Sequence, residues 1–215
     1  LWHHVYTWAT NHGYFFDNAG REGHDGVNGA APTTAKHEPV TLVNWRDAIV
    51  WCNAYSEIEG KSSVYHHVGS YDNPIKDSRD GGYGSSVNTL PGSFDNPYVN
   101  WTATGYRLPT EGQWQYAASY KNGIEDWTPC TWASGATAYY NDATATGAVA
   151  WYSANSGPST KIVGTRSANV LGIYDMSGNV YEWCWDWYGT LPMAAQTEYR
   201  GLASETSRIL RGGSY

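Results

Sequence analysis

Apolar and polar residues follow a helical period in two segments of the N-terminal half. The first segment runs from Leu1 and predicts an amphipathic helix that ends near Gly13, a residue suited to the left-handed cap of a helix. The second predicts a helix that begins with Asn44 as its N-cap and stops at Gly60. Cys52 falls on the apolar face of this helix, so we expect it to pack inward as a small hydrophobic residue.

The C-terminal half carries one helix signal and one strand signal. Thr110 to Gln113 has the pattern of a capping box, and Pro109 before it blocks extension backwards, which predicts a short helix through Ala118. From Val180 to Tyr188 the residues alternate, which predicts a strand with aromatic residues on one face and two acids on the other. The aromatic face would carry Tyr181, Trp183, Trp185 and Trp187.

Long stretches without a period separate these elements. Residues 17–36, residues 65–101 and the stretch after Gly123 are rich in turn-forming residues. We expect loops there, with a short strand or two between 65 and 101, and the stretch after Gly123 shows no helical period.

Composition agrees with a loop-rich protein. The 215 residues include 12 Trp, 18 Tyr and 24 Gly, and only 15% are charged, which is not the composition of a helical bundle. The length fits a single domain of the larger kind, and we expect it to be monomeric.

Charge and hydropathy exclude two classes of partner. The net charge is -7 and no Lys/Arg cluster occurs, so a nucleic acid backbone has no electrostatic footprint to bind. No apolar run reaches the roughly 18 to 20 residues of a membrane-spanning helix.

The cysteines and histidines do not suggest a metal site. The three cysteines, Cys52, Cys130 and Cys184, lack metal-ligand spacing, and the pairs His3–His4 and His66–His67 are expected to be exposed.

Four sequence blocks, in this order, resemble the formylglycine-generating enzyme (sulfatase-modifying factor) family. They are Pro39–Ala48, Tyr106–Glu111, Gly172–Trp183 and Arg211–Tyr215. The resemblance implies an α+β, C-type lectin-like fold of low secondary-structure content, with few short helices and a small antiparallel sheet. Residues 1–215 would form one such domain, apparently truncated at both ends, because the family's N-terminal hairpin and cysteine segment are not in the chain.

The resemblance also implies a structural calcium ion at the third block. Its ligands would come from Ser177, Gly178, Asn179, Val180 and Glu182, an oxygen-rich turn of the kind that Ca²⁺ prefers. The alternative is that Asn179 and Glu182 satisfy backbone donors in the turn.

The pocket implied by the resemblance lies at the fourth block. Ser214 matches the serine beside the family's reactive cysteines, and Trp183 matches an aromatic residue near the same pocket. In active relatives two cysteines bind copper(I) and oxidise a sulfatase cysteine to formylglycine with O₂, and soft thiolates suit that ion. The chain ends before those cysteines, so a Cu⁺ cofactor is expected only if they are present downstream.

Two functions from different classes follow. One is a formylglycine-generating oxidase that acts on a sulfatase-like peptide. The other is a non-enzymatic protein that binds a protein or glycan ligand, like the retroelement-diversified variable proteins of the same fold, and the wealth of Trp and Tyr suits such a surface. For either function we expect a location outside the cytoplasm, such as a surface lipoprotein.

Overall fold

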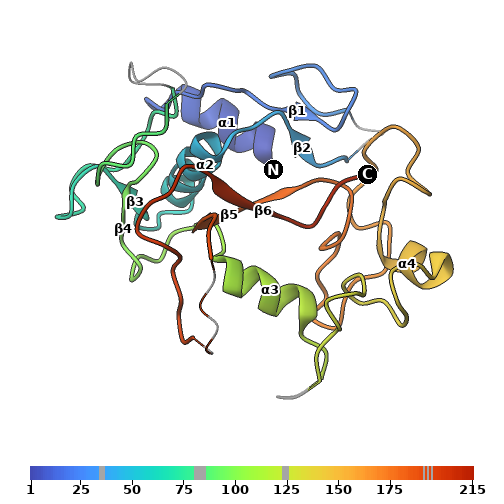
Figure 1. Cartoon of the computed structure of the whole chain (residues 1–215). Coiled ribbons are helices and arrows are strands. Elements are labelled where there is room, and N and C mark those ends of the chain that lie inside the picture. The colour runs from blue at the N-terminus through green and yellow to red at the C-terminus, as the bar shows by residue number, and fades with distance from the viewer. Residues whose placement is uncertain (34–36, 80–85, 123–125, 191, 193, 195) are drawn as a thin grey trace.

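The computed structural model describes residues 1–33, 37–79, 86–122, 126–190, 192, 194 and 196–215. Its central feature is the antiparallel pair of β5 (Glu182–Trp187) and β6 (Arg208–Arg211). Helices α1 (Trp2–Thr10) and α2 (Trp45–Ile58) lie on one side of this pair, and α3 (Glu111–Ser119) lies on the other (Figure 1). Helix α4 (Ala143–Val149) lies at the periphery (Figure 1).

The predicted helices form where their caps are encoded. In α2 the Asn44 side chain accepts from the Asp47 backbone at 2.9 Å, and the Asp47 carboxylate accepts from Asn44 N at 2.9 Å. In α3 the Thr110 hydroxyl and the Gln113 amide make the same reciprocal pair. Each capping box satisfies backbone donors that the first turn of a helix leaves unpaired, so the local sequence decides where α2 and α3 begin.

Helix α4 was not predicted, because the stretch after Gly123 shows no helical period. Its seven residues are too few to show an apolar period, and only Thr146 and Val149 are buried. The helix begins because the Asp142 carboxylate accepts from the backbone of Thr144 and Ala145. The cap was therefore a better signal than the hydrophobic pattern.

The remaining strands are two-residue pieces. β1 (Arg21–Glu22) pairs with β2 (Val40–Thr41), and β3 (Tyr65–His66) pairs with β4 (Tyr98–Val99), both antiparallel. The short strands predicted between 65 and 101 are confirmed. The described residues thus form a loop-rich α+β fold with few helices and small antiparallel sheets, as expected.

The core covers both faces of β5. Trp185 packs with Trp45, Ile49 and Tyr65 on the side of α2, and Cys184 and Asp186 are buried as well. The strand is confirmed, but its second face is not open, because α3 covers it and the backbone N–H of Glu111 donates to Asp186 at 2.6 Å.

His66 is also buried, contrary to expectation. Its place in β3 puts it within the fold, where its Nε2 lies 3.0 Å from the carbonyl oxygen of Ser63. Cys52 is buried, as predicted, in the core around Trp45 and Trp185.

Candidate functional site

The turn before β5 and the segment after β6 meet at one end of the strand pair, because antiparallel strands place the start of one beside the end of the other. Gly178 N donates to Gly212 O at 2.8 Å, and Tyr215 N donates to Asn179 O at 3.1 Å. The two blocks singled out in the sequence, residues 177–182 and 211–215, therefore form one continuous region.

Asn179 is the most deeply held residue of this region. Its side chain is buried, with Oδ1 accepting from Lys161 N at 3.0 Å and Nδ2 donating to Lys161 O at 3.1 Å. Its own N–H donates to Trp151 O at 2.8 Å, and its φ of +60° lies in the left-handed region, where Asn is tolerated better than most residues. The Asn179 amide thus joins the 177–182 turn to the segment around Lys161.

Gly178 and Ser177 shape the same turn. Gly178 has φ +81°, and a Cβ at that position would lie 2.0 Å from the carbonyl oxygen of Trp151. The Ser177 hydroxyl accepts from Ser134 N at 3.0 Å. Both residues fix the turn against neighbouring loops.

Two carboxylates, those of Asp175 and Glu182, line one cavity beside the turn. Glu182 Oε2 accepts from the Trp114 indole at 2.6 Å, and burial together with the nearby negative charge of Asp175 raises the pKa of Glu182. Asp175 Oδ2 accepts from Gly164 N at 2.8 Å, while its buried Oδ1 has no hydrogen-bond partner among the described residues. Asp175, Asn179, Val180 and Glu182 line one cavity of about 330 Å³.

Asp175 was missed by the sequence analysis. It lies in the third block, seven positions before Glu182, and has φ +57°, which is uncommon for a residue other than glycine. No local pattern shows that it lines the same cavity as Glu182.

Ser214 is exposed, and Trp183 is half-buried and structural. The Trp183 indole donates to Val43 O at 3.2 Å, which ties β5 to the segment that enters α2. Next to Ser214, Tyr215 Oη lies 2.6 Å from His24 Nδ1, so the loop around His24 reaches this end of the chain.

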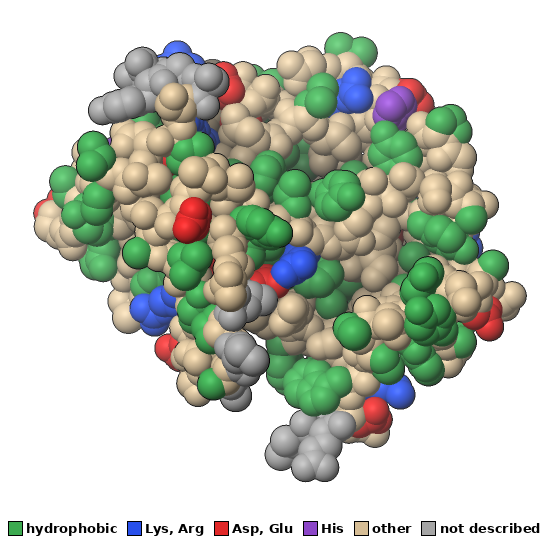
Figure 2. All heavy atoms as spheres, in the orientation of Figure 1, with side chains coloured by type: hydrophobic (Ala, Val, Ile, Leu, Met, Phe, Trp, Pro, Cys, Tyr) green, Lys and Arg blue, Asp and Glu red, His purple; other side chains and the backbone are tan. Residues whose placement is uncertain are grey.

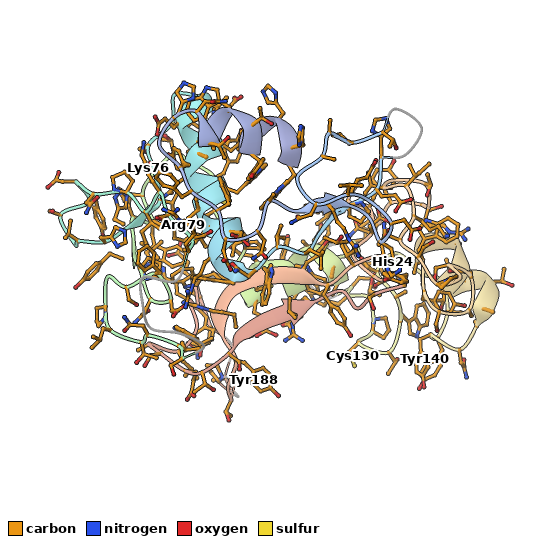
Figure 3. The ribbon with its side chains drawn as sticks, turned by 90° about the horizontal axis from the view of Figure 1, so that it is seen from above. His24, Lys76, Arg79, Cys130, Tyr140 and Tyr188 are labelled. Atoms are coloured by element: carbon orange, nitrogen blue, oxygen red, sulfur yellow. The ribbon has the colours of Figure 1, made fainter. Side chains whose placement is uncertain are left out.

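The three cysteines are all free thiols and differ in exposure. Burial raises the pKa of Cys52 and of Cys184 to about 12, so neither forms a thiolate near neutral pH. Cys130 is exposed, on the loop after α3, and Figure 3 shows it near the edge of the molecule with Tyr140. A copper(I) site built of two thiolates does not fit this set, because only one of the three is accessible.

The face of the molecule shown in Figure 2, which carries α3, is largely uncharged, with a few Lys, Arg, Asp and Glu side chains spread over it. Among the described residues, no group of three or more His, Cys, Asp or Glu side chains comes together as a metal site. No helix in the described part of the chain is both long enough and apolar enough to span a membrane.

Comparison with known proteins identifies relatives over nearly the whole chain. Residues 4–215 match the family model described as a sulfatase-modifying factor enzyme 1-like domain. The chain is 32% identical to a chaperone protein LppX of Paenibacillus barcinonensis, over 88% of this chain and 64% of that protein. It is 31% identical to the formylglycine-generating enzyme of Thermomonospora curvata, over 62% of this chain and 48% of the enzyme.

Solved structures show the same fold. The Treponema denticola variable protein 1 superposes with a TM-score of 0.65 at 33% identity, covering 86% of this chain and 64% of that one. A structure titled CarF gives a TM-score of 0.66 at 26% identity, over the whole of this chain and 70% of its own. The chain thus spans less than two thirds of the length of both curated relatives and of the variable protein.

Proposed function

The chain belongs to the sulfatase-modifying factor enzyme 1-like domain family, and from that premise we propose that it binds a protein ligand. The observation that carries the proposal is the exposure of aromatic side chains on a loop-rich scaffold. Tyr140, Tyr181 and Tyr188, for example, are 59%, 58% and 71% exposed.

Two relatives support a binding role. One is named a chaperone protein and is 32% identical, and another is a variable protein with the same fold at 33% identity. A loop-rich scaffold with many exposed aromatic side chains suits a binding surface, since Tyr and Trp supply large contact area at low entropic cost.

The experiment measures binding and catalysis on the same preparation. We expect the chain to suppress the aggregation of a chemically denatured model protein, followed by light scattering, at near-stoichiometric ratios. We expect no aldehyde when a sulfatase-derived cysteine peptide is incubated with the chain, copper(I) and O₂ and examined by mass spectrometry. Aldehyde formation above the copper-only control would overturn the proposal in favour of an oxidase.

The oxidase is the second candidate, favoured by the 31% identity to a formylglycine-generating enzyme. In that case Ser214 and Trp183 would line the substrate pocket, as the resemblance implies. A protein that carries the two cysteines downstream of Tyr215 should then oxidise the peptide, its Ser214→Ala variant should lose this activity, and its Cys130→Ser variant should keep it.

We further propose that calcium stabilises the turn at residues 177–182. The donor set fits the ion. Asp175 Oδ1 is buried without a hydrogen-bond partner among the described residues, Glu182 lines the same cavity, and the backbone carbonyls of the turn would supply further oxygens. Asn179 would hold the turn rather than ligate through its side chain, because both ends of its amide are already bound to Lys161.

Thermal unfolding with calcium or with a chelator tests this site. An ion that binds only the folded state raises its stability in proportion to the logarithm of its concentration. We expect Asp175→Asn and Glu182→Gln to abolish the calcium-dependent rise in Tm, while Asp142→Asn, at the cap of α4, keeps it. An equal calcium response in all three variants would remove the ion from this turn.

A further inference from the structure

A second cavity, of about 600 Å³, lies between the N-terminal half of α3 and the segment that follows β5. Its lining includes Trp101, Arg107, Gln113, Gln115, Tyr116 and Arg200. We call it the α3 groove. It shares no lining residue with the cavity that Asp175 and Glu182 line. One of the sequence blocks, Tyr106–Glu111, contributes Arg107 to its lining.

Two guanidinium groups converge on one indole ring in this groove. The Cζ atom of Arg107 lies 5.2 Å from the centroid of the Trp101 ring, and that of Arg200 lies 4.5 Å from it. Arg107 comes from the segment that enters α3 and Arg200 from the segment between β5 and β6. Stacking on an aromatic face restricts a guanidinium and leaves its edge free to donate hydrogen bonds.

The positive charge of these groups is weakly compensated. Arg107 Nη1 donates to the neutral oxygens Leu108 O and Gln113 Oε1, and none of the described carboxylates lies within ion-pair distance of it. Arg200 Nη2 lies 3.5 Å from Glu198 Oε2, and the two side chains are 47% and 79% exposed. An ion pair this exposed contributes little binding energy, so it neutralises Arg200 only weakly.

Nearby acids do not cancel this charge. Glu111 also lines the groove, but it is 2% exposed and forms an ion pair with Arg211. The first turn of α3 adds to the positive potential, because Gly112 is exposed there and its N–H has no partner among the described residues. The α3 groove is therefore a local donor site on a chain whose net charge is -7.

We propose that the α3 groove binds an acidic peptide segment, with a carboxylate held by Arg107 and Arg200 and a neighbouring side chain packed against Trp101 and Tyr116. Arg and carboxylate form the strong, directional pair of protein recognition. The Gln115 amide provides a donor and an acceptor for a peptide backbone, whereas the Gln113 amide provides donors only, because its oxygen accepts from Thr110 N and Arg107. The overall negative charge disfavours long polyanions, which would approach the rest of the surface against repulsion.

This inference deepens the proposed protein-binding function and rests on it. The Arg and Trp side chains that cluster here are of the residue types that dominate the energetics of protein interfaces. The volume lies within the range of cavities that enclose a small ligand or a few side chains. The groove would therefore select, among protein ligands, those with exposed Asp or Glu beside an aromatic residue.

The test titrates the 215-residue chain with a short fluorescent peptide of alternating Glu and Tyr, and with the same peptide carrying Gln for Glu. We expect the acidic peptide to bind at least about tenfold more tightly, since one charge-assisted hydrogen bond accounts for about that factor. Binding should weaken as salt is added, because exposed charges are screened.

Variants locate the site. Arg107→Gln and Arg200→Gln should each reduce affinity for the acidic peptide about tenfold and leave the Gln peptide unaffected. Arg79→Gln is the matched control, because Arg79 also stacks on an aromatic ring, Phe15, with Asp77 beside it. Figure 3 shows Arg79 well apart from Tyr188, which follows β5 and opens the segment that lines the groove.

Three results would overturn the inference. The first is equal affinity of the chain for the two peptides. The second is that the Arg107→Gln/Arg200→Gln double variant, with unchanged Tm, still binds the acidic peptide. The third is that the groove binds a heparin-derived oligosaccharide instead of the peptide, which would assign it to a sulfated glycan. Suppression of aggregation that survives in the double variant would refute the groove and leave the proposed binding function standing, so the two failures are distinguishable.

Discussion

Replacing Asn179 by alanine tests how much of the domain's stability depends on the turn before β5. The side chain is 1% exposed, and its amide makes two hydrogen bonds to the backbone of Lys161, at 3.0 and 3.1 Å. The substitution removes both and leaves the N–H and the C=O of Lys161 without these partners. Each loss costs about 1 to 2 kcal/mol when the orphaned group is largely buried.

The backbone adds to this cost. Asn179 has φ +60°, and an alanine held in the left-handed region costs about 1 kcal/mol more than in an ordinary conformation. Together these terms predict a loss of about 3 to 5 kcal/mol in the free energy of unfolding. Because a domain is typically stable by only about 5 to 15 kcal/mol, the variant should be close to unfolding at 37 °C.

Urea unfolding followed by tryptophan fluorescence measures the loss. Asn11→Ala is the control, because Asn11 is exposed and makes one local side-chain bond, to Thr7 O at 2.8 Å, with φ -88°. Its expected cost is below about 1 kcal/mol. If Asn179→Ala loses no more than this control, the buried amide does not hold the turn, and the reasoning fails.

Three further predictions concern backbone, pH and thiols. Gly178→Ala should lower the free energy of unfolding by about 2 kcal/mol or more in the same assay, because the new Cβ meets a carbonyl oxygen and φ is positive. Burial raises the pKa of Asp186 to about 6, so the folded state binds its proton more tightly than the unfolded state. The free energy of unfolding of the wild type, measured relative to that of Asp186→Asn, should therefore rise as pH falls from about 6 to 4 and stay constant above about 7. A difference between the two proteins that does not change with pH would contradict this. In native protein a thiol reagent should label Cys130 rapidly and Cys52 and Cys184 only on unfolding, as peptide mass mapping would show.

The helices of this fold could be predicted because their signals are local. Asn44 with Asp47, and Thr110 with Gln113, form complete capping boxes within four residues, and the structure has both. Helix α4 is also encoded locally, by Asp142, but its lack of an apolar stripe hid it.

The site could be predicted only in part, because its contacts are not local. The blocks at 177–182 and 211–215 were singled out separately, and only the structure shows that they lie side by side. The partner of the Asn179 amide, Lys161, lies 18 residues upstream in a loop. The α3 groove is still less accessible to sequence reasoning, since Trp101, Arg107 and Arg200 meet only after three irregular segments have packed. Loop conformations of this kind depend on tertiary contacts rather than on propensity.

The two indole bonds between β5 and the start of α2 have a consequence for synthesis on the ribosome. Trp45 Nε1 donates to Cys184 O across 139 residues, and Trp183 Nε1 donates to Val43 O across 140. Translation proceeds at about 5 to 20 residues per second, so the apolar face of α2 waits on the order of ten seconds for its partner strand.

During that wait the nascent chain exposes aromatic surface that later becomes core. Contacts between residues so far apart in sequence also form slowly in the complete chain. The domain is therefore expected to complete its core only when β5 emerges, late in its own translation, and to depend in the meantime on whatever protects nascent chains from aggregation.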